Sequence, residues 1–187
     1  MGATPARPEG CVVWLTGLSG SGKSTLARAL CEEMIQRGRR VENLDGDAIR
    51  EIFPSTGFTR EERDAHVKRV GFLASRLEFH GVTVVCSLIS PYREARQAVR
   101  TLCRRFLEIH VATPIEECER RDPKGLYRRA RRGEIAHFTG VDDPYESPDA
   151  PEMIIDTLQM PIEQCVDRIV GLVEAADLQA PMRAVRP

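Results

Sequence analysis

The sequence has no long apolar run, and none of its stretches approaches the roughly 18 residues that a membrane-spanning helix needs. Residues 1–10 contain no apolar segment of the kind found in secretory signals. Ala6 stands where an N-myristoylation signal has serine or threonine. These absences predict a cytoplasmic protein with no membrane partner.

Neither sign of charge is in excess, because 27 lysines and arginines stand against 28 aspartates and glutamates, for a net charge of -1. The chain therefore has no overall field that would hold nucleic acid. Its six cysteines include no CxxC pair, which predicts buried, reduced thiols rather than disulfides or a zinc site. What is present, 42% hydrophobic residues in 187, is enough for the core of one ordinary domain.

Strand-like and helix-like segments alternate along the chain. The expected strands are 11–16, 41–44, 82–89, 106–111 and 153–155, and the expected helices are 23–37, 59 onward, 92–103, 114 onward and 161–175. Thr59 and Glu62 have the spacing of a capping box. The apolar run 82–89 is typical of a central strand in a parallel sheet. This order predicts an α/β fold, a doubly wound, mainly parallel sheet with helices on both faces.

Residues 17–24 read Gly-Leu-Ser-Gly-Ser-Gly-Lys-Ser and match the pattern G-x-x-x-x-G-K-[ST] at every fixed position. The glycines let successive backbone N–H groups point at phosphate oxygens, and the helix that begins here adds its positive end. Lys23 is placed to reach the β- and γ-phosphates and the Ser24 hydroxyl to ligate Mg²⁺. The motif predicts a nucleoside triphosphate site made by Gly17, Leu18, Ser19, Gly20, Ser21, Gly22, Lys23, Ser24 and Thr25.

The expected strand at 82–89 carries Ser87, and not aspartate, where a Walker B acid would stand. The acidic groups must then come from Asp45 and Asp47, at the carboxyl end of the second strand, where α/β sheets bind ligands. One carboxylate can orient or deprotonate an attacking hydroxyl, and one can hold Mg²⁺ with Ser24. Asp47 as a mere helix N-cap is an alternative of equal weight.

Longer motifs occur at 44–50 (LDGDAIR), 57–59 with Arg63, 87–93 (SLISPYR), 118–127 (CERRDPKGLY) and 138–146 (FTGVDDPYE). With the phosphate loop, they resemble the adenylylsulfate kinase family over about residues 11–175. The resemblance implies a P-loop NTPase-type kinase that moves the γ-phosphoryl group of ATP, with Mg²⁺, to the 3′-hydroxyl of adenosine 5′-phosphosulfate (APS). The products are ADP and 3′-phosphoadenylyl sulfate, as in sulfate assimilation. It also implies a homodimer and a functional link or fusion to ATP sulfurylase.

The resemblance gives the acceptor side its residues. Phe58 and Phe138 match positions that sandwich the adenine, and Arg50 and Arg63 match positions that hold the phosphosulfate. The implied catalytic residues are Lys23, Asp45, Ser90 and Lys124. The implied acceptor-binding residues are Asp45, Asp47, Arg50, Phe58, Arg63, His66, Ile89, Ser90, Pro91, Lys124, Gly125, Leu126 and Phe138.

Ser90 matches a serine described in some family members as a phosphorylated intermediate. Direct in-line transfer to the 3′-hydroxyl needs only positioning and charge neutralisation. We therefore expect Ser90 to act as a hydrogen-bonding residue of the site, with the phosphorylated intermediate as the alternative.

Two positions depart from the family pattern. His66 stands where the family has asparagine, and Lys68 where arginine is frequent. A neutral imidazole can replace one amide hydrogen bond, but its charge would vary near neutral pH. These departures concern substrate affinity more than the class of reaction.

The basic run at 128–132 (Arg-Arg-Ala-Arg-Arg) resembles a nucleic-acid patch by itself. A basic lid at about 122–150 that closes over phosphates explains it better in a chain whose net charge is only -1. We expect an N-terminal arm at 1–10, a P-loop kinase domain at 11–176 that includes this lid, and a tail at 177–187.

Three other interpretations stay open. The chain also fits another small-metabolite P-loop kinase, acting on gluconate, shikimate or a nucleoside, or a nucleotide sensor without activity. It fits one domain of a longer bifunctional protein too, although Met1 favours a separate polypeptide.

Overall fold

A parallel sheet lies at the centre of the computed structural model, which describes residues 10–53 and 57–178. Its strands are β1 (Cys11–Thr16), β2 (Val41–Asp45), β3 (Thr83–Ser87), β4 (Phe106–Val111) and β5 (Met153–Ile155). Their order across the sheet is β2-β3-β1-β4-β5, and each neighbouring pair is parallel. This arrangement confirms the predicted α/β fold.

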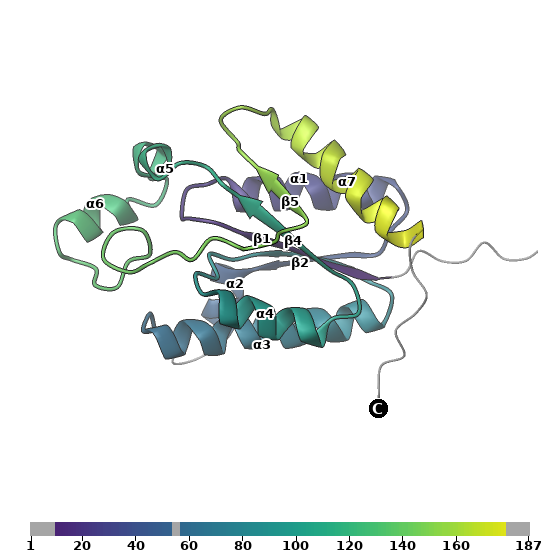
Figure 1. The fold of residues 1–187 in the computed structure, drawn as a ribbon, viewed down its shortest axis with the longest axis horizontal. Coiled ribbons are helices and arrows are strands. Elements are labelled where there is room, and N and C mark those ends of the chain that lie inside the picture. Colours follow the sequence, from purple (N-terminus) through teal and green to yellow (C-terminus); the bar gives the residue numbers. More distant parts are fainter. Residues whose placement is uncertain (1–9, 54–56, 179–187) are drawn as a thin grey trace, which may run out of the picture.

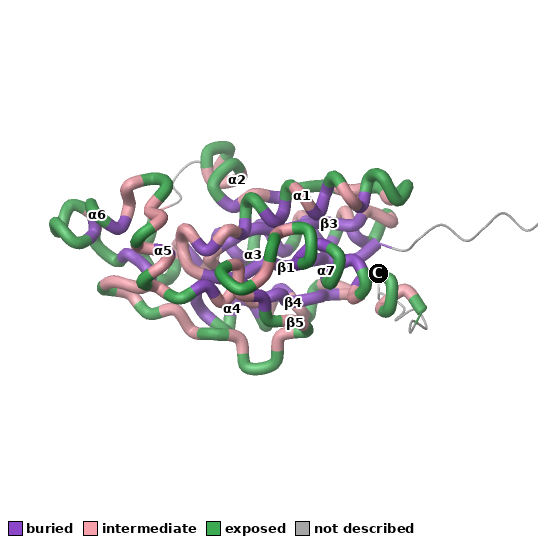
Figure 2. Tube along the Cα trace, turned by 90° about the horizontal axis from the view of Figure 1, so that it is seen from above, coloured by how far each residue is buried: buried purple, intermediate pink, exposed green. Residues whose placement is uncertain are grey.

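Helices cover both faces of the sheet (Figure 1). On one face lie α1 (Lys23–Gln36) and α7 (Ile162–Leu178), and on the other lie α3 (Arg60–Phe79) and α4 (Arg93–Leu102). Because alternate side chains of a strand point to opposite faces, β1 serves both cores. Val13 belongs to the α1 and α7 core, whereas Val12 and Trp14 belong to the α3 and α4 core. The buried trace in the middle of Figure 2 includes β1, β3 and β4, the inner strands of this sheet.

Three short helices extend the molecule beyond the carboxyl ends of the strands. They are α2 (Gly46–Ile52), α5 (Ile115–Arg121) and α6 (Leu126–Arg131), and α5 and α6 form the projecting end in Figure 1. A small separate core holds α5 and α6 together, made by Cys118, Tyr127, Ala130 and Phe138. The segment predicted as a lid therefore has its own packing and contains a helix that the sequence pattern did not reveal.

Most element boundaries agree with the expected ones to within a residue or two, and the capping box of Thr59 and Glu62 is confirmed. The strand expected at 82–89 is β3, a buried interior strand with a parallel partner on each side, as predicted. One expectation about elements is wrong, the end of the last helix. The last helix runs to Leu178, because Asp177 accepts hydrogen bonds from Arg39 at 2.7 Å and Arg105 at 2.7 Å, which hold its final turn.

All six cysteines lie in the described residues and are free thiols, five of them buried, as predicted. Within those residues, no helix is both long enough and apolar enough to cross a membrane. Of the arm expected at 1–10 and the tail expected at 177–187, residues 1–9 and 179–187 lie outside the described residues.

Candidate active site

A cavity of about 740 Å³ opens at the carboxyl ends of β1, β2 and β3. It brings together most of the residues that the sequence predicted. These are Ser19, Gly20, Gly22, Lys23, Ser24, Thr25, Asp45, Asp47, Arg50, Phe58, Arg63, His66, Ile89, Ser90, Pro91, Lys124, Leu126 and Phe138. Gly17, Leu18, Ser21 and Gly125 do not line it.

The phosphate loop is held in shape by backbone geometry and by contacts outside the cavity. Gly22 has φ 98° at the start of α1, a left-handed conformation that glycine adopts without strain. The carbonyl of buried Ser21 accepts hydrogen bonds from the Thr113 hydroxyl at 3.0 Å and the Thr157 hydroxyl at 3.1 Å. Ser21 thus anchors the loop rather than facing the cavity.

Lys23 lies folded within the loop that carries it. Its Nζ donates to the Leu18 carbonyl at 2.7 Å and to the Ser21 hydroxyl at 3.3 Å. Burial lowers the pKa of Lys23 from 10.5 to about 8, since desolvation disfavours the charged ammonium. A bound polyphosphate would supply the negative charge that this buried cation lacks.

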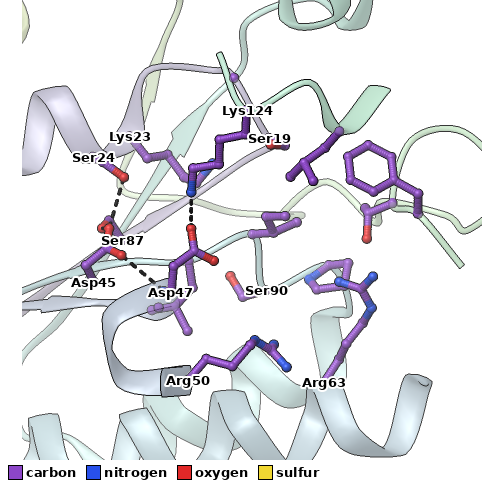
Figure 3. Close-up of a pocket in the computed structure, with 18 of the residues that line it drawn as sticks. Ser19, Lys23, Ser24, Asp45, Asp47, Arg50, Arg63, Ser87, Ser90 and Lys124 are labelled. Carbon is purple, nitrogen blue, oxygen red and sulfur yellow. Dashed lines mark hydrogen bonds and ion pairs between the residues drawn. The ribbon is translucent and has the colours of Figure 1, made fainter. Parts of the chain in front are cut away.

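Asp45 is the N-cap of α2 and receives four hydrogen bonds. Its Oδ1 accepts from the backbone N–H groups of Asp47 at 3.1 Å and Ala48 at 3.3 Å. Its Oδ2 accepts from the hydroxyls of Ser87 at 2.9 Å and Ser24 at 3.0 Å (Figure 3). The alternative of Asp47 as the N-cap is wrong, because Asp45 occupies that position.

Burial acts to raise the pKa of Asp45, but the hydrogen bonds from Ser87, Ser24 and the two backbone amides outweigh it and hold the pKa below its usual value. The carboxylate is therefore ionised at neutral pH. Ser24 and Asp45 together present a hydroxyl and a carboxylate oxygen at one point of the cavity. This donor set fits Mg²⁺, which takes oxygen ligands and is commonly held by one or two protein groups together with substrate phosphates and water.

Lys124 reaches across the cavity from the segment between α5 and α6. It forms an ion pair with Asp47 at the start of α2, and Figure 3 shows the two side chains pointing toward each other. Both are exposed. The predicted lid and the predicted acidic motif are therefore joined directly.

The two arginines predicted to hold the phosphosulfate bind backbone carbonyls in this structure. Arg50 donates to Gly57 at 2.7 Å, and Arg63 donates to Phe58 at 2.8 Å and to His137 at 2.7 Å. Both guanidinium groups also lie over the Phe58 ring. Phe58 is half exposed, whereas Phe138 is buried edge-on against Tyr127 at a centroid distance of 5.0 Å.

His66 differs from its sequence-based expectation. Its Nε2 lies 3.0 Å from the Gly46 carbonyl, which can only accept, so this nitrogen carries the proton. Burial and the charge of Arg50 lower the pKa of His66. The lowered pKa favours the neutral ring near pH 7, whereas the sequence left its charge variable there.

Ser90 is buried and its hydroxyl already has partners. The Trp14 indole N–H donates to Ser90 Oγ at 3.1 Å, and Ser90 Oγ donates to the Thr16 hydroxyl at 2.9 Å. Its φ of 40° is left-handed, and the Arg96 guanidinium holds its carbonyl at 2.6 Å. These contacts suit a side chain that shapes the loop at Ile89 to Pro91, as the hydrogen-bonding role requires.

Replacing Ser90 by alanine is expected to lower kcat by at most about 150-fold, because the change removes two neutral hydrogen bonds worth about 0.5–1.5 kcal/mol each. Enzyme incubated with γ-labelled ATP should carry no label on this serine before or during turnover. Loss of kcat by more than about 1,000-fold, together with a labelled serine in the unaltered protein, would establish the phosphorylated intermediate instead.

Several cavity residues escaped the sequence analysis. Ser87 is one of them. Its position at the end of β3 indicates that it faces the ligand side of the sheet, whereas the motif pattern shows only that an aspartate is missing there. Arg121, Arg129 and Thr139 also line the cavity. Arg129 lies in the basic run, and the arginines of that run, Arg129 included, form ion pairs with Asp122, Glu119 and Glu134.

The doubly wound sheet, the phosphate loop at the end of β1 and the acidic groups facing it define a kinase of the P-loop class. The family model for adenylylsulphate kinase matches residues 9–156, and the chain belongs to that family. An adenylyl-sulfate kinase of Synechococcus sp. (strain JA-2-3B'a(2-13)) is 48% identical over 163 residues, which cover 87% of this chain and 93% of the relative.

Solved structures agree with this assignment. The Mycobacterium tuberculosis APS kinase CysC, in complex with AMPPNP and APS, is 38% identical with a TM-score of 0.85, over 89% of this chain and 99% of that one. The hexameric APS kinase from Thiobacillus denitrificans is 36% identical with a TM-score of 0.71. The match covers 92% of this chain and 30% of that one. The chain is thus an ATP-dependent phosphotransferase of the adenylylsulfate kinase family.

Proposed function

We propose that this protein transfers the γ-phosphoryl group of ATP to the 3′-hydroxyl of APS, releasing ADP and 3′-phosphoadenylyl sulfate. The observation that carries the proposal is that one cavity joins the phosphate loop at Lys23 to two aromatic rings, Phe58 and Phe138, and to two arginines, Arg50 and Arg63. Aromatic rings suit a planar base, and guanidinium groups suit tetrahedral oxyanions. APS offers both in one molecule.

In this mechanism the acceptor 3′-oxygen forms a bond to the γ-phosphorus while the bond from that phosphorus to the ADP oxygen breaks. Lys23 and Lys124 approach the transferring group from the phosphate loop and from the lid, and stabilise its charge. The pKa of Asp45 is lowered, so its carboxylate is a weak base. It is therefore suited to orient the acceptor 3′-hydroxyl, whose proton leaves to solvent. Mg²⁺, held by Ser24 and Asp45, would neutralise the phosphates and orient them.

We infer a cytoplasmic homo-oligomer, for which a dimer is the expected form, and a functional link to ATP sulfurylase, which makes APS. The hexameric Thiobacillus denitrificans relative supports self-association of such chains. Size-exclusion chromatography with light scattering would test the dimer directly.

A coupled ADP-release assay tests the proposed reaction. ATP and Mg²⁺ are supplied with APS and, separately, with shikimate, gluconate and adenosine, and the phosphorylated product is identified by mass spectrometry. We expect ADP release with APS alone, with a 3′-phosphorylated product. Release with another acceptor would assign a different small-metabolite kinase, and release with none would favour a nucleotide sensor.

A further inference from the structure

Arg63 links the two segments that carry the aromatic rings of the cavity. Its Nε donates to the Phe58 carbonyl at 2.8 Å, and its Nη2 donates to the His137 carbonyl at 2.7 Å. Phe58 precedes α3, whereas His137 is next to Phe138, so the two segments are far apart in the sequence. A planar guanidinium that holds both backbones sets the separation of the two rings.

An acid that does not line the cavity lies beside the Arg63 guanidinium. Asp143 Oδ2 lies 4.0 Å from Arg63 Nε and accepts a hydrogen bond from the Tyr92 hydroxyl at 2.6 Å. The side chains of Arg63 and Asp143 are 7% and 17% exposed, and Tyr92 is 1% exposed. Burial and the Asp143 carboxylate raise the pKa of Tyr92 to about 12, so its hydroxyl remains a donor at neutral pH.

Asp143 also fixes the turn that carries the second ring. Its backbone carbonyl accepts from Gly140 N–H at 2.8 Å, and its own N–H donates to the Phe138 carbonyl at 3.3 Å. Tyr92 follows Pro91 of the acceptor loop and caps α4. The hydroxyl of Tyr92 and the carboxylate of Asp143 thus connect the acceptor loop, the Phe138 turn and Arg63.

We propose that Tyr92 and Asp143 are positioning residues for the acceptor, which orient Arg63 and through it set the spacing of Phe58 and Phe138. The inference rests on the proposed function, since it assumes that these rings hold the planar base of APS. Neither residue lines the cavity, so both act through Arg63. Without the Tyr92 hydroxyl, Asp143 loses the short hydrogen bond that fixes its carboxylate beside the Arg63 guanidinium.

Tyr92→Phe keeps the buried ring and removes only the hydroxyl. We expect the KM for APS to rise about 5- to 30-fold. The variant loses a hydrogen bond to a charged group, and part of that free energy is lost from the binding of APS. The KM for ATP and the kcat should stay within about twofold. Steady-state kinetics with each substrate varied in turn measures this split.

Tyr127→Phe is the matched control. Tyr127 is equally buried, but its hydroxyl donates to the Ser19 carbonyl of the phosphate loop at 3.0 Å. Its loss should leave the KM for APS within about twofold. Asp143→Asn, which keeps an acceptor for Tyr92 but loses the charge facing Arg63, should raise the KM for APS less than Asp143→Ala does.

The outcomes separate this inference from the proposed function. If the unaltered protein does not turn over APS, both are overturned. If it does, but Tyr92→Phe leaves the KM for APS unchanged, only this inference is overturned. A parallel rise in the KM for APS and for ATP, or the same rise in Tyr127→Phe, would show a merely structural role and would also overturn it.

Discussion

Asp45→Asn is expected to lower kcat by about 100- to 1,000-fold, the cost of removing one well-placed charged group from a site of charge stabilisation. The fold should survive, because asparagine is as good an N-cap as aspartate and would keep the bonds from Asp47 N–H and Ala48 N–H. The Ser24 and Ser87 hydroxyls can rotate to accept from the new amide. ADP release under saturating ATP and APS measures the effect.

Asp156→Asn is the control for that substitution. Asp156 also accepts a backbone hydrogen bond, from Leu158 N–H at 2.9 Å, but it does not line the cavity. Its replacement should leave kcat within about twofold. If Asp45→Asn kept nearly full turnover, the Asp45 carboxylate would have no part in catalysis. That result would favour the interpretation of the protein as a nucleotide sensor.

Lys23→Met is expected to have the second large effect, a loss of kcat of about 100- to 1,000-fold, since an ammonium aimed at the phosphates is removed. Stability should change in the opposite direction. At pH 7 the nucleotide-free protein carries a buried charge at Lys23, so the methionine variant should be more stable by roughly 1–3 kcal/mol, the free-energy equivalent of the lowered pKa less the lost bonds to Leu18 and Ser21.

The titration of Lys23 makes the free energy of unfolding depend on pH. Between about pH 8, the pKa of Lys23 in the fold, and 10.5, its ordinary value, the unfolded chain binds the proton and the folded chain does not. The contribution of Lys23 to the stability of the unaltered protein therefore rises with pH across that window, and the stability advantage of Lys23→Met over the unaltered protein shrinks. Denaturant unfolding at pH 7 and pH 10 measures both, with exposed Lys68→Met as control. If Lys23→Met were less stable than the unaltered protein at pH 7, burial of the Lys23 ammonium would not be destabilising, and the prediction would be wrong.

The sequence was sufficient wherever function depends on neighbours in the chain. The phosphate loop at 17–24 is recognisable because glycines, a lysine and a serine must follow one another between a strand and a helix. The same holds for the capping box at Thr59 and for the strands, whose apolar runs are local signals. The site residues assigned by resemblance largely gather in one cavity, although the part that each plays in the reaction stays a prediction.

The end of α7 and the charge of His66 depend on contacts between segments that are distant in the sequence, so no local sequence pattern predicts them. The end of α7 is extended by Asp177 because Arg39 and Arg105 lie beside it. The charge of His66 depends on its burial and on Arg50, neither of which sequence spacing reveals.

The sequence by itself determined the fold class, the phosphate loop and the family, because each can be recognised from residues that are adjacent or regularly spaced. Only the tertiary structure decided that Asp45 caps α2 and stays ionised, that Ser90 is enclosed by Trp14 and Thr16, and that Tyr92 meets Asp143. The physical reason is that pKa values and hydrogen-bond partners are set by burial and by the groups that folding brings together.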